Sequence, residues 1–273
     1  MKNIAVIQDI SGLGRCSLGA ALPVISAMGV HAIPVPTAIY TNQTGFSRFA
    51  VHGCEALLGE YPGMWQEIGV ELDGILTGFM GTHEQIAAAQ TIIDTFRRPQ
   101  TLLLIDPVMG DNGQLYPVFD EAFCKAIGEF ARQADVITPN VTELCLLVGN
   151  DPLVFLRAPP HEQKNMLMRM CAALPQPTII VTGWKIDDLV LNAVWHNSKL
   201  ETYSTTAVAG SYSGTGDLFA ATVCAGLVRG DALPVCITRA ATFLHAALTE
   251  AASLSLPPKH GVPFENHLKE LLY

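Results

Sequence analysis

The chain has 273 residues, of which 49% are hydrophobic and only 15% are charged, so it can bury a large core and is not a disordered segment. Its net charge of −9, with no basic run longer than Arg97-Arg98, argues against nucleic acid as the main partner. No apolar run reaches the roughly 18 residues that a membrane-spanning helix needs, so we expect no membrane partner either.

The seven cysteines are scattered along the chain and never form a C-x-x-C pair. This distribution predicts buried, reduced thiols rather than disulfides or a zinc site. The first residues lead directly into an apolar run with no signal or transit peptide before it. We therefore expect a cytoplasmic protein.

Apolar runs of strand length alternate with longer helical patterns along the whole chain. The predicted strands are 4–7, 32–35, 74–76, 102–105, 136–137, 178–181 and 190–194, and the predicted helices are 17–27, 54–68, 84–96, 120–132, 162–173, 217–228 and 234–252. Such alternation is typical of a parallel sheet covered on both faces, and buried parallel strands are continuously apolar. We predict an α/β fold with three αβα layers, a central, mostly parallel sheet and a single domain over residues 1–273.

Ligands of such sheets bind beyond the carboxyl ends of the strands. Small, polar or acidic residues follow nearly every predicted strand at that end, in segments 8–12, 77–79, 106–111, 138–143 and 182–183. A binding site is therefore predicted at this edge of the sheet.

A glycine-rich turn, Gly214-Thr215-Gly216-Asp217, leads into the helix predicted at 217–228. Glycines let backbone N–H groups approach a ligand closely, and a helix start adds unpaired N–H groups, so this junction suits a phosphate. Asp217 beside it is in a position to take a proton from an attacking hydroxyl. The alternative is an ordinary helix start with Asp in the first turn, and the motif alone does not decide between them.

Two acidic motifs also allow two interpretations. Asp106 and Asp111 suggest a divalent cation, whereas the Asp111-Asn112-Gly113 sequence also suits a simple turn. Asn140 and Glu143 have the spacing of a capping box at a helix start, and they could also reach Mg²⁺ and its waters.

Other chemistries find little support. The sequence has no P-loop motif, and its Gly12-Leu13-Gly14 segment lacks the third glycine and the later acidic residue of a dinucleotide-binding fingerprint. Ser11 and Ser213 have no recognisable His and Asp partners, so a hydrolase triad is not supported.

Taken together, the motifs resemble a known family. Gly214-Thr215-Gly216-Asp217 resembles the anion-hole and catalytic-base signature of ribokinase-like kinases, and Asn140-x-x-Glu143 resembles their magnesium motif. Segments 106–111, 138–140 and 41–45 resemble the pyridoxal kinases within that superfamily. The resemblance implies a ribokinase-like fold without a separate lid domain, and phosphorylation of the 5′-hydroxymethyl group of vitamin B6 vitamers by ATP in the salvage of pyridoxal phosphate.

The resemblance also implies a role for each matching position. Asp217 would be the catalytic base, and Gly214, Thr215 and Gly216 the anion hole. The substrate-binding positions are Asp9, Thr44, Gly45, Phe79 and Asp217. The ATP-binding positions are Asp111, Tyr116, Asn140, Glu143, Thr182 and Gly183, together with the anion hole. The metal-binding positions are Asp106, Thr138, Asn140 and Glu143, for Mg²⁺ with ATP and for a monovalent cation such as K⁺.

Two positions depart from the pattern, since pyridoxal kinases usually carry Ser where Asp9 stands and Tyr where Phe79 stands. Asp9 could pair with a protonated pyridine nitrogen or with an amine-bearing substrate, so the preferred vitamer stays open. Hydroxymethylpyrimidine kinase shares the fold and is the main alternative, although its members commonly have Cys where Asp217 stands. Sugar or nucleoside kinases and a non-catalytic vitamin-binding protein are further alternatives. The family resemblance also implies a homodimer.

Overall fold

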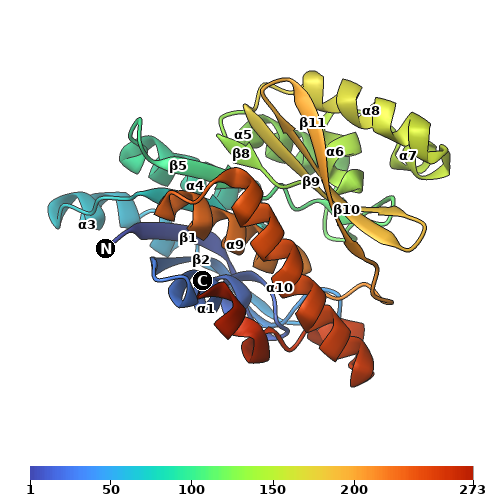
Figure 1. Cartoon of the computed structure of the whole chain (residues 1–273). Coiled ribbons are helices and arrows are strands. Elements are labelled where there is room, and N and C mark those ends of the chain that lie inside the picture. Colours follow the sequence, from blue (N-terminus) through green and yellow to red (C-terminus); the bar gives the residue numbers. More distant parts are fainter. Residues whose placement is uncertain (273) are drawn as a thin grey trace. The chain divides into compact units, whose positions relative to one another are not determined.

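The computed structural model describes residues 1–272, which divide into two compact units. Unit 1 comprises residues 1–80, 84–104 and 208–272, and unit 2 comprises residues 81–83 and 105–207. Figure 1 shows the course of the chain with its helices and strands labelled. Each unit is an α/β structure, as the alternating pattern predicts.

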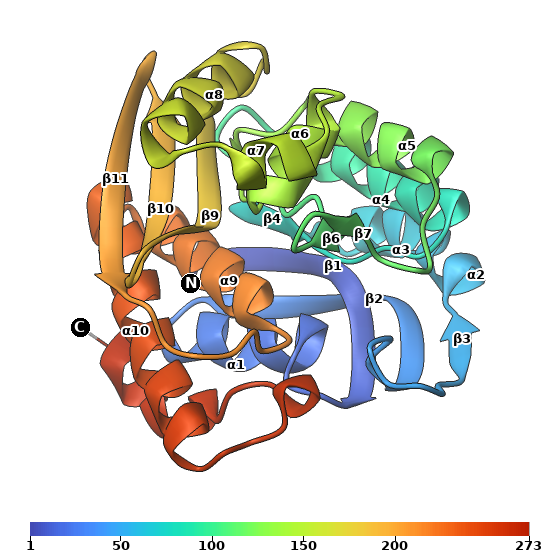
Figure 2. The same ribbon diagram turned by 90° about the vertical axis from the view of Figure 1, so that its right-hand side faces the viewer.

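Unit 1 is built on parallel strands with helices on both sides. Its strands are β1 (Asn3–Leu13), β2 (His31–Asn42), β3 (Val51–Gly53), β4 (Gly74–Thr77) and most of β5 (Leu102–Ile105), in the order β5-β4-β1-β2-β3. β1 pairs in parallel with both β2 and β4. Its helices are α1 (Ser17–Ala27), α2 (Glu55–Leu58), α3 (Tyr61–Glu67), α4 (His83–Phe96), α9 (Thr215–Arg229) and α10 (Leu233–Ser253). Figure 2 shows α4 on one side of these strands and α1, α9 and α10 on the other.

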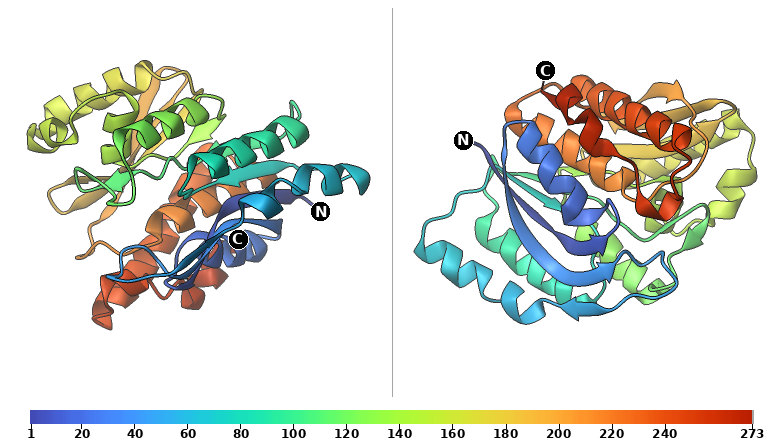
Figure 3. Two further views of the ribbon diagram at one scale, coloured as in Figure 1. Left: turned by 180° about the vertical axis from the view of Figure 1, so that it is seen from behind. Right: turned by 90° about the horizontal axis from the view of Figure 1, so that it is seen from below.

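Two 3₁₀ helices, η1 (Pro258–His260) and η2 (Phe264–Leu271), end unit 1. η2 packs on α1 and α10, so the end of the chain returns to its first helix (Figure 3). The core of this unit is apolar: Ile4, Ile7, Leu18, Ile75 and Phe243 are among its fully buried side chains.

Unit 2 contains β8 (Val136–Ile137), β9 (Thr178–Ile186), β10 (Leu189–His196) and β11 (Lys199–Thr206), in the order β11-β10-β9-β8. β8 and β9 are parallel, whereas β10 is antiparallel to both of its neighbours. A small hairpin of β6 (Gly110–Asp111) and β7 (Gln114–Leu115) stands apart from this sheet. The helices are α5 (Glu121–Ala131), α6 (Val141–Leu147), α7 (Pro152–Arg157) and α8 (Pro160–Ala172).

The predicted α/β class and its mostly parallel strands are confirmed, but several boundaries differ. The helix predicted at 54–68 is two helices, α2 and α3, which separate at Gly59 and Glu60 just before Pro62. Gly and Pro interrupt a helix because one adds backbone freedom and the other lacks an N–H donor. An additional helix, α7, lies between the helices predicted at 120–132 and 162–173 and ends at Arg157.

Several strands are longer than predicted, and four strands, β3, β6, β7 and β11, were not predicted at all. β1 and β2 continue to Leu13 and Asn42 as a paired ladder. Gly12 allows this extension, because a Cβ there would lie 2.7 Å from the backbone oxygen of Thr41. β3 pairs antiparallel with the far half of β2 and so extends the same sheet rather than forming a separate lid. β11 was missed because it is a largely exposed edge strand with few apolar residues.

Candidate functional site

The glycine turn at residues 214–216 forms the start of α9, as the sequence predicts. Gly214 is the N-cap residue in the left-handed conformation, with φ of 83°. A Cβ at Gly214 would lie 1.8 Å from the backbone oxygen of Arg15, so no other residue fits this close approach. Because α9 begins at Thr215, the N–H groups of its first turn have no partners within the helix, and they suit an anion.

Asp217 lies in the first turn of α9 and is half-buried. Its negative charge disfavours ionisation of the thiol of Cys16, the N-cap residue of α1. The charge of Asp9 has the same effect. Burial and these two carboxylates together raise the pKa of Cys16 to about 12. Cys16 is therefore a neutral thiol, and the two predicted site residues Asp9 and Asp217 both lie close enough to raise its pKa.

Asp9 is a buried carboxylate, with a relative exposure of 3%. Its Oδ2 accepts a hydrogen bond of 3.0 Å from the Ser11 hydroxyl, while its Oδ1 has no hydrogen-bond partner among the described residues. Burial raises its pKa from 3.8 to about 6, although the hydroxyls of Ser17 and Ser11 lower it. A buried oxygen without a donor is costly, so a cationic or N–H-bearing ligand would stabilise Asp9.

Ser17 contributes to the same region through an unusual backbone conformation. It is a buried residue at the start of α1 with φ of 52°, a left-handed value that costs a non-glycine residue about 1 kcal/mol or more. A hydrogen bond from its hydroxyl lowers the pKa of Asp9. Strain of this kind concentrates at functional sites, which supports a role for this end of β1.

Tyr40, which the sequence analysis missed, lies beside Asp9. It is opposite Ser11 in the β1–β2 ladder, and its ring contacts Phe79 edge-on, with centroids 6.1 Å apart, and Phe49 at 5.7 Å. Burial, Asp9 and Glu55 raise the pKa of Tyr40 to about 12. These aromatic rings and the Asp9 carboxylate would suit a flat heteroaromatic ring. No sequence motif points to Tyr40, since only the strand register brings it to Asp9.

The loop after β2 carries two further predicted substrate residues, Thr44, which is half-buried, and Gly45, which is exposed. Gly45 donates its N–H to the Oε1 of Gln43 at 2.7 Å. Unit 1 therefore contains every predicted substrate-binding residue and the anion hole. Asp9 and Asp217 both influence Cys16, and Tyr40 is influenced by Asp9 and contacts the ring of Phe79.

Unit 2 contains the other predicted residues, and its central motif is the start of α6. Asn140 and Glu143 form the complete capping box that their spacing predicts: Asn140 Oδ1 accepts from the Glu143 N–H at 3.0 Å, and Glu143 Oε2 accepts from the Asn140 N–H at 2.8 Å. Asn140 also donates from Nδ2 to the carbonyl of Gly110 at 2.8 Å. The structural interpretation of this motif is confirmed.

Glu143 also belongs to a pair of buried carboxylates with Asp106. Burial, and then the charge of Asp106, raise the pKa of Glu143 well above its usual value, although backbone N–H groups such as that of Met109 lower it. Burial raises the pKa of Asp106 to about 7, while a 2.9 Å hydrogen bond from the Thr138 hydroxyl lowers it. Asp106 thus interacts with the carboxylate of Glu143.

This pair fits a hard cation. Among residues 1–272, no Lys or Arg forms an ion pair with Asp106 or Glu143, so a bound cation would supply the missing positive charge. Carboxylate and hydroxyl oxygens, here with Thr138, are the ligands that Mg²⁺ and similar ions prefer. The described residues contain no cluster of three His, Cys, Asp or Glu side chains arranged for a metal, so other ligands would have to complete the coordination.

The remaining predicted nucleotide residues surround α6. Asp111 lies in the β6–β7 hairpin, whose turn at Asn112 and Gly113 has positive φ at both residues, as the Asp-Asn-Gly sequence predicts. The N–H of Gly113 donates to the Thr142 hydroxyl at 2.9 Å, which attaches the hairpin to α6. Tyr116 follows the hairpin and is 37% exposed.

Thr182 and Gly183 lie within β9, next to the start of α6. The N–H of Thr182 donates to the Pro139 carbonyl at 2.9 Å, and Thr182 forms an isolated bridge with Asn140. Gly183 has φ of 68°, and a Cβ there would meet no other atom within 4 Å. Unit 2 therefore brings together Asp106, Thr138, Glu143, Asn140 and Thr182.

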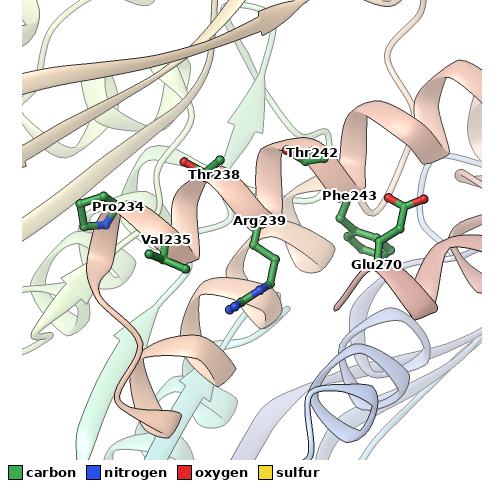
Figure 4. Close-up of a pocket in the computed structure, with 7 residues that line it drawn as sticks. All are labelled: Pro234, Val235, Thr238, Arg239, Thr242, Phe243 and Glu270. Carbon is green, nitrogen blue, oxygen red and sulfur yellow. The ribbon is translucent and has the colours of Figure 1, made fainter. Parts of the chain in front are cut away.

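A pocket of about 440 Å³ lies elsewhere in unit 1, between α10 and Glu270 (Figure 4). Its size suits a small ligand. Its charged residues, however, are already paired: Arg239 bonds to Asp231 at 2.6 Å and Glu270 to His267 at 2.9 Å. It contains none of the predicted site residues, so we assign the site from the residues at the strand ends and the start of α9.

Comparison with known proteins decides the family. The family described as phosphomethylpyrimidine kinase matches residues 17–262. The chain belongs to this family. It is therefore a kinase, as the glycine turn and Asp217 predict. Within residues 1–272, no helix is long and apolar enough to cross a membrane.

Relatives of this phosphomethylpyrimidine kinase family member include named vitamin B6 kinases. A pyridoxine/pyridoxal/pyridoxamine kinase of Bordetella avium is 28% identical over 97% of this chain and 95% of its own. A candidate phosphomethylpyrimidine kinase of Bacteroides thetaiotaomicron, crystallised with pyridoxal, has 29% identity and a TM-score of 0.92 over 99% of this chain and 95% of its own. Pyridoxal kinase from Lactobacillus plantarum has 27% identity and a TM-score of 0.88, covering 99% and 96% of the two chains.

Similar proteins also include one that is named for a pyrimidine substrate rather than a vitamin B6 vitamer. A hydroxymethylpyrimidine/phosphomethylpyrimidine kinase of Rhizobium meliloti is 26% identical over 94% of this chain and 95% of its own. The resemblance to pyridoxal kinases and the ribokinase-like fold are confirmed, and both substrate classes occur among similar proteins.

Proposed function

We propose that this kinase transfers the γ-phosphoryl group of ATP to the 5′-hydroxymethyl group of a vitamin B6 vitamer, and so serves the salvage of pyridoxal phosphate. The observation that carries this proposal is the arrangement in unit 1. The charges of Asp217 and Asp9 both raise the pKa of Cys16, and the contacting aromatic rings of Tyr40 and Phe79 lie beside Asp9. A pyridine ring offers a flat face, a ring nitrogen and a hydroxymethyl group, which suit the aromatic rings, Asp9 and Asp217 respectively.

In this proposal Asp217 removes the proton from the 5′-hydroxyl as the oxygen attacks phosphorus. The N–H groups of Gly214, Thr215 and Gly216 hold the oxygens of the transferred group, where negative charge must be stabilised. The open first turn of α9 supports this role, and so does the requirement for glycine at residue 214. The vitamer contacts are assigned to Asp9, Thr44, Gly45 and Phe79.

We assign the nucleotide to the residues around α6, namely Asp111, Tyr116, Asn140, Glu143, Thr182 and Gly183. Asn140 and Glu143 would hold Mg²⁺, and Asp106, Thr138 and Thr182 would hold a monovalent ion such as K⁺. A bound Mg²⁺ neutralises phosphate charge during the transfer. The buried pair of Asp106 and Glu143, which has no Lys or Arg partner among the described residues, supports a positive ion in this region.

We extend the proposal to the whole chain. Residues 1–273 would act as one ribokinase-like kinase domain in a cytoplasmic homodimer. The alignment of the Bacteroides thetaiotaomicron structure over 99% of this chain supports the single domain. Size-exclusion chromatography with light scattering would test the dimer.

One experiment tests the proposed reaction directly. The purified protein is incubated with Mg-ATP and, separately, with pyridoxal, pyridoxine, pyridoxamine or hydroxymethylpyrimidine, and each phosphorylated product is measured. We expect a 5′-phosphate from at least one vitamer. Thermal stabilisation by a vitamer with no ADP formed would instead identify a non-catalytic binding protein.

Hydroxymethylpyrimidine is the second candidate acceptor, because the matching family is described as phosphomethylpyrimidine kinase and the Rhizobium meliloti relative as hydroxymethylpyrimidine/phosphomethylpyrimidine kinase. The same panel distinguishes the two. A kcat/KM that is higher for hydroxymethylpyrimidine than for all three vitamers would assign the chain to the thiamine-precursor branch.

A further inference from the structure

A short segment near the end of the chain contacts both loops to which we have assigned substrate groups. The segment comprises η1 and Gly261, that is, residues 258–261. On one side, the carbonyl of Pro258 accepts a hydrogen bond of 3.1 Å from the N–H of Ser213, directly before the glycine turn at residues 214–216. On the other side, the carbonyl of Lys259 accepts a hydrogen bond of 3.1 Å from the Nε2 of Gln43.

Gln43 uses both ends of its amide. Its Oε1 accepts from the N–H of Gly45 at 2.7 Å, while its Nε2 donates to the Lys259 carbonyl. Its own N–H donates to the carbonyl of Leu13 at 3.0 Å, and its side chain is 9% exposed. A buried amide with both groups bonded holds its neighbours in fixed positions, since losing either bond leaves a buried polar group unsatisfied.

Further contacts fix the segment in place. His260 contacts the ring of Phe46 edge-on, with centroids 5.6 Å apart. Gly261 has φ of 75°, and a Cβ there would lie 2.7 Å from the Cβ of Arg15 and 3.1 Å from the backbone oxygen of Ser213. Arg15 in turn forms an ion pair of 2.7 Å with Glu265. The segment therefore fills the space between the acceptor loop, residues 43–46, and the anion turn, residues 213–216.

We propose that Gln43 is a positioning residue that couples the acceptor loop to the anion turn through the backbone carbonyl of Lys259. This inference rests on the proposed function, in which the acceptor loop binds the vitamer that is phosphorylated and the anion turn binds the phosphoryl group that is transferred. Transfer between the two demands that both be held within a fraction of an ångström, so a residue that fixes their separation raises the rate without touching either.

Two variants separate the halves of this link. Gln43→Ala removes both side-chain bonds. Gln43→Glu keeps an oxygen for the Gly45 N–H but has no donor for the Lys259 carbonyl. We expect both variants to raise the KM for the acceptor about tenfold and to lower kcat several-fold, with the KM for ATP changed less than twofold. Wild-type kinetics in Gln43→Glu would overturn the proposal, because the bond to Lys259 would then be dispensable.

Lys259→Ala is the matched control. It removes an exposed side chain but keeps the carbonyl that Gln43 uses. We expect its acceptor KM and kcat to stay within twofold of wild type. An effect as large as that of Gln43→Glu would show that the lysine side chain, and not the backbone link, matters, and would overturn the coupling.

Amide hydrogen exchange tests the coupling without any assay of activity. In Gln43→Glu we expect faster exchange at Ser213, whose bond is to the neighbouring Pro258 carbonyl, whereas Lys259→Ala leaves it unchanged. Unchanged exchange at Ser213 in Gln43→Glu contradicts the proposal. If the wild-type protein phosphorylates no acceptor, the proposed function fails, and this exchange experiment still decides whether Gln43 couples the two loops.

Discussion

Asp217 is the residue on which the proposed chemistry depends most directly. We expect Asp217→Asn to lower kcat by about 10²–10⁴-fold, the usual contribution of a general base, because the amide cannot accept the proton of the attacking hydroxyl. ATP affinity and thermal stability should change little. Steady-state kinetics, ATP titration and thermal unfolding measure these three quantities.

A matched control is Asp94→Asn, which removes an exposed acid that bonds to Gln90 on α4. It should keep full activity. Turnover of Asp217→Asn within a factor of a few of wild type would exclude Asp217 as the base.

Asp9 governs the choice of acceptor in our proposal, because its Oδ1 lacks a donor among the described residues. Replacement by Ser removes the buried carboxylate. We expect Asp9→Ser to change the relative kcat/KM for pyridoxal, pyridoxine and pyridoxamine by roughly tenfold or more, and the KM for ATP much less. Equal effects on all three vitamers would show that Asp9 contributes to the fold alone.

At the scale of the element, the start of α9 combines a required backbone conformation with a close approach. Gly214→Ala would place a Cβ 1.8 Å from the backbone oxygen of Arg15 and hold Ala at φ of 83°. We expect the variant to lose more than about 1 kcal/mol of stability and nearly all of its activity, because the turn must move. Chemical denaturation and kinetics measure both effects.

Gly230 at the other end of α9 provides the control. It also has a positive φ, of 96°, but a Cβ there meets nothing within 4 Å. Gly230→Ala should therefore cost only about 1 kcal/mol of stability, through φ alone, and keep its activity. If both variants lose activity equally, the close approach at Gly214 is not what matters.

The start of α6 has two assigned roles, as a helix cap and as part of the nucleotide site. Asn140→Ala should lower the free energy of unfolding by about 1–2 kcal/mol, because the Glu143 N–H and the Gly110 carbonyl both lose their partner. If Asn140 also binds the nucleotide, the KM for ATP rises.

The cap of α5 offers a comparison of the same kind. Asp120 accepts a hydrogen bond of 2.8 Å from the Phe123 N–H and has no assigned role in the site. Asp120→Ala should lose similar stability without a change in the KM for ATP. A KM for ATP that is equally unaffected in Asn140→Ala would leave Asn140 with the cap alone.

At the scale of the whole molecule, the buried ionisable groups predict how stability depends on pH. The pKa of Asp9 is raised to about 6, so between its unfolded value of 3.8 and pH 6 the folded state holds a proton that the unfolded state has lost. Burial lowers the pKa of His267, but hydrogen bonds to Glu270 and Glu250 outweigh it and raise the pKa above 6.5. Its stabilisation is present below pH 6.5 and is lost as the pH rises through the folded pKa. Both groups make the folded state less stable at higher pH.

We therefore expect the free energy of unfolding to fall as the pH rises from about 5 to 8, as measured by urea denaturation. Asp9→Asn should remove part of this slope and stabilise the protein at pH 8 by up to about 3 kcal/mol, since two pKa units of burial penalty disappear. His267→Gln should remove another part of the slope by lowering stability at acidic pH. A stability that rises over this range would contradict the pKa directions.

The sequence alone determined the features that depend on neighbouring residues. The alternation of strands and helices, the capping box at Asn140, the Asp-Asn-Gly hairpin turn and the glycine turn before Asp217 were all predicted. Each of these is fixed by hydrogen bonds, backbone conformations or apolar periodicity within a few residues, and such local preferences can be read from the chain.

Only the tertiary structure decided which distant residues meet. Tyr40 lies beside Asp9 because of the register of β1 and β2, Asp106 interacts with the distant Glu143, and Gln43 bonds to Lys259. The edge strand β11, with few apolar residues, exists because β10 pairs with it. Strand order and register bring these partners together, and no pattern within a short stretch of sequence encodes the pairing of two segments far apart in the chain.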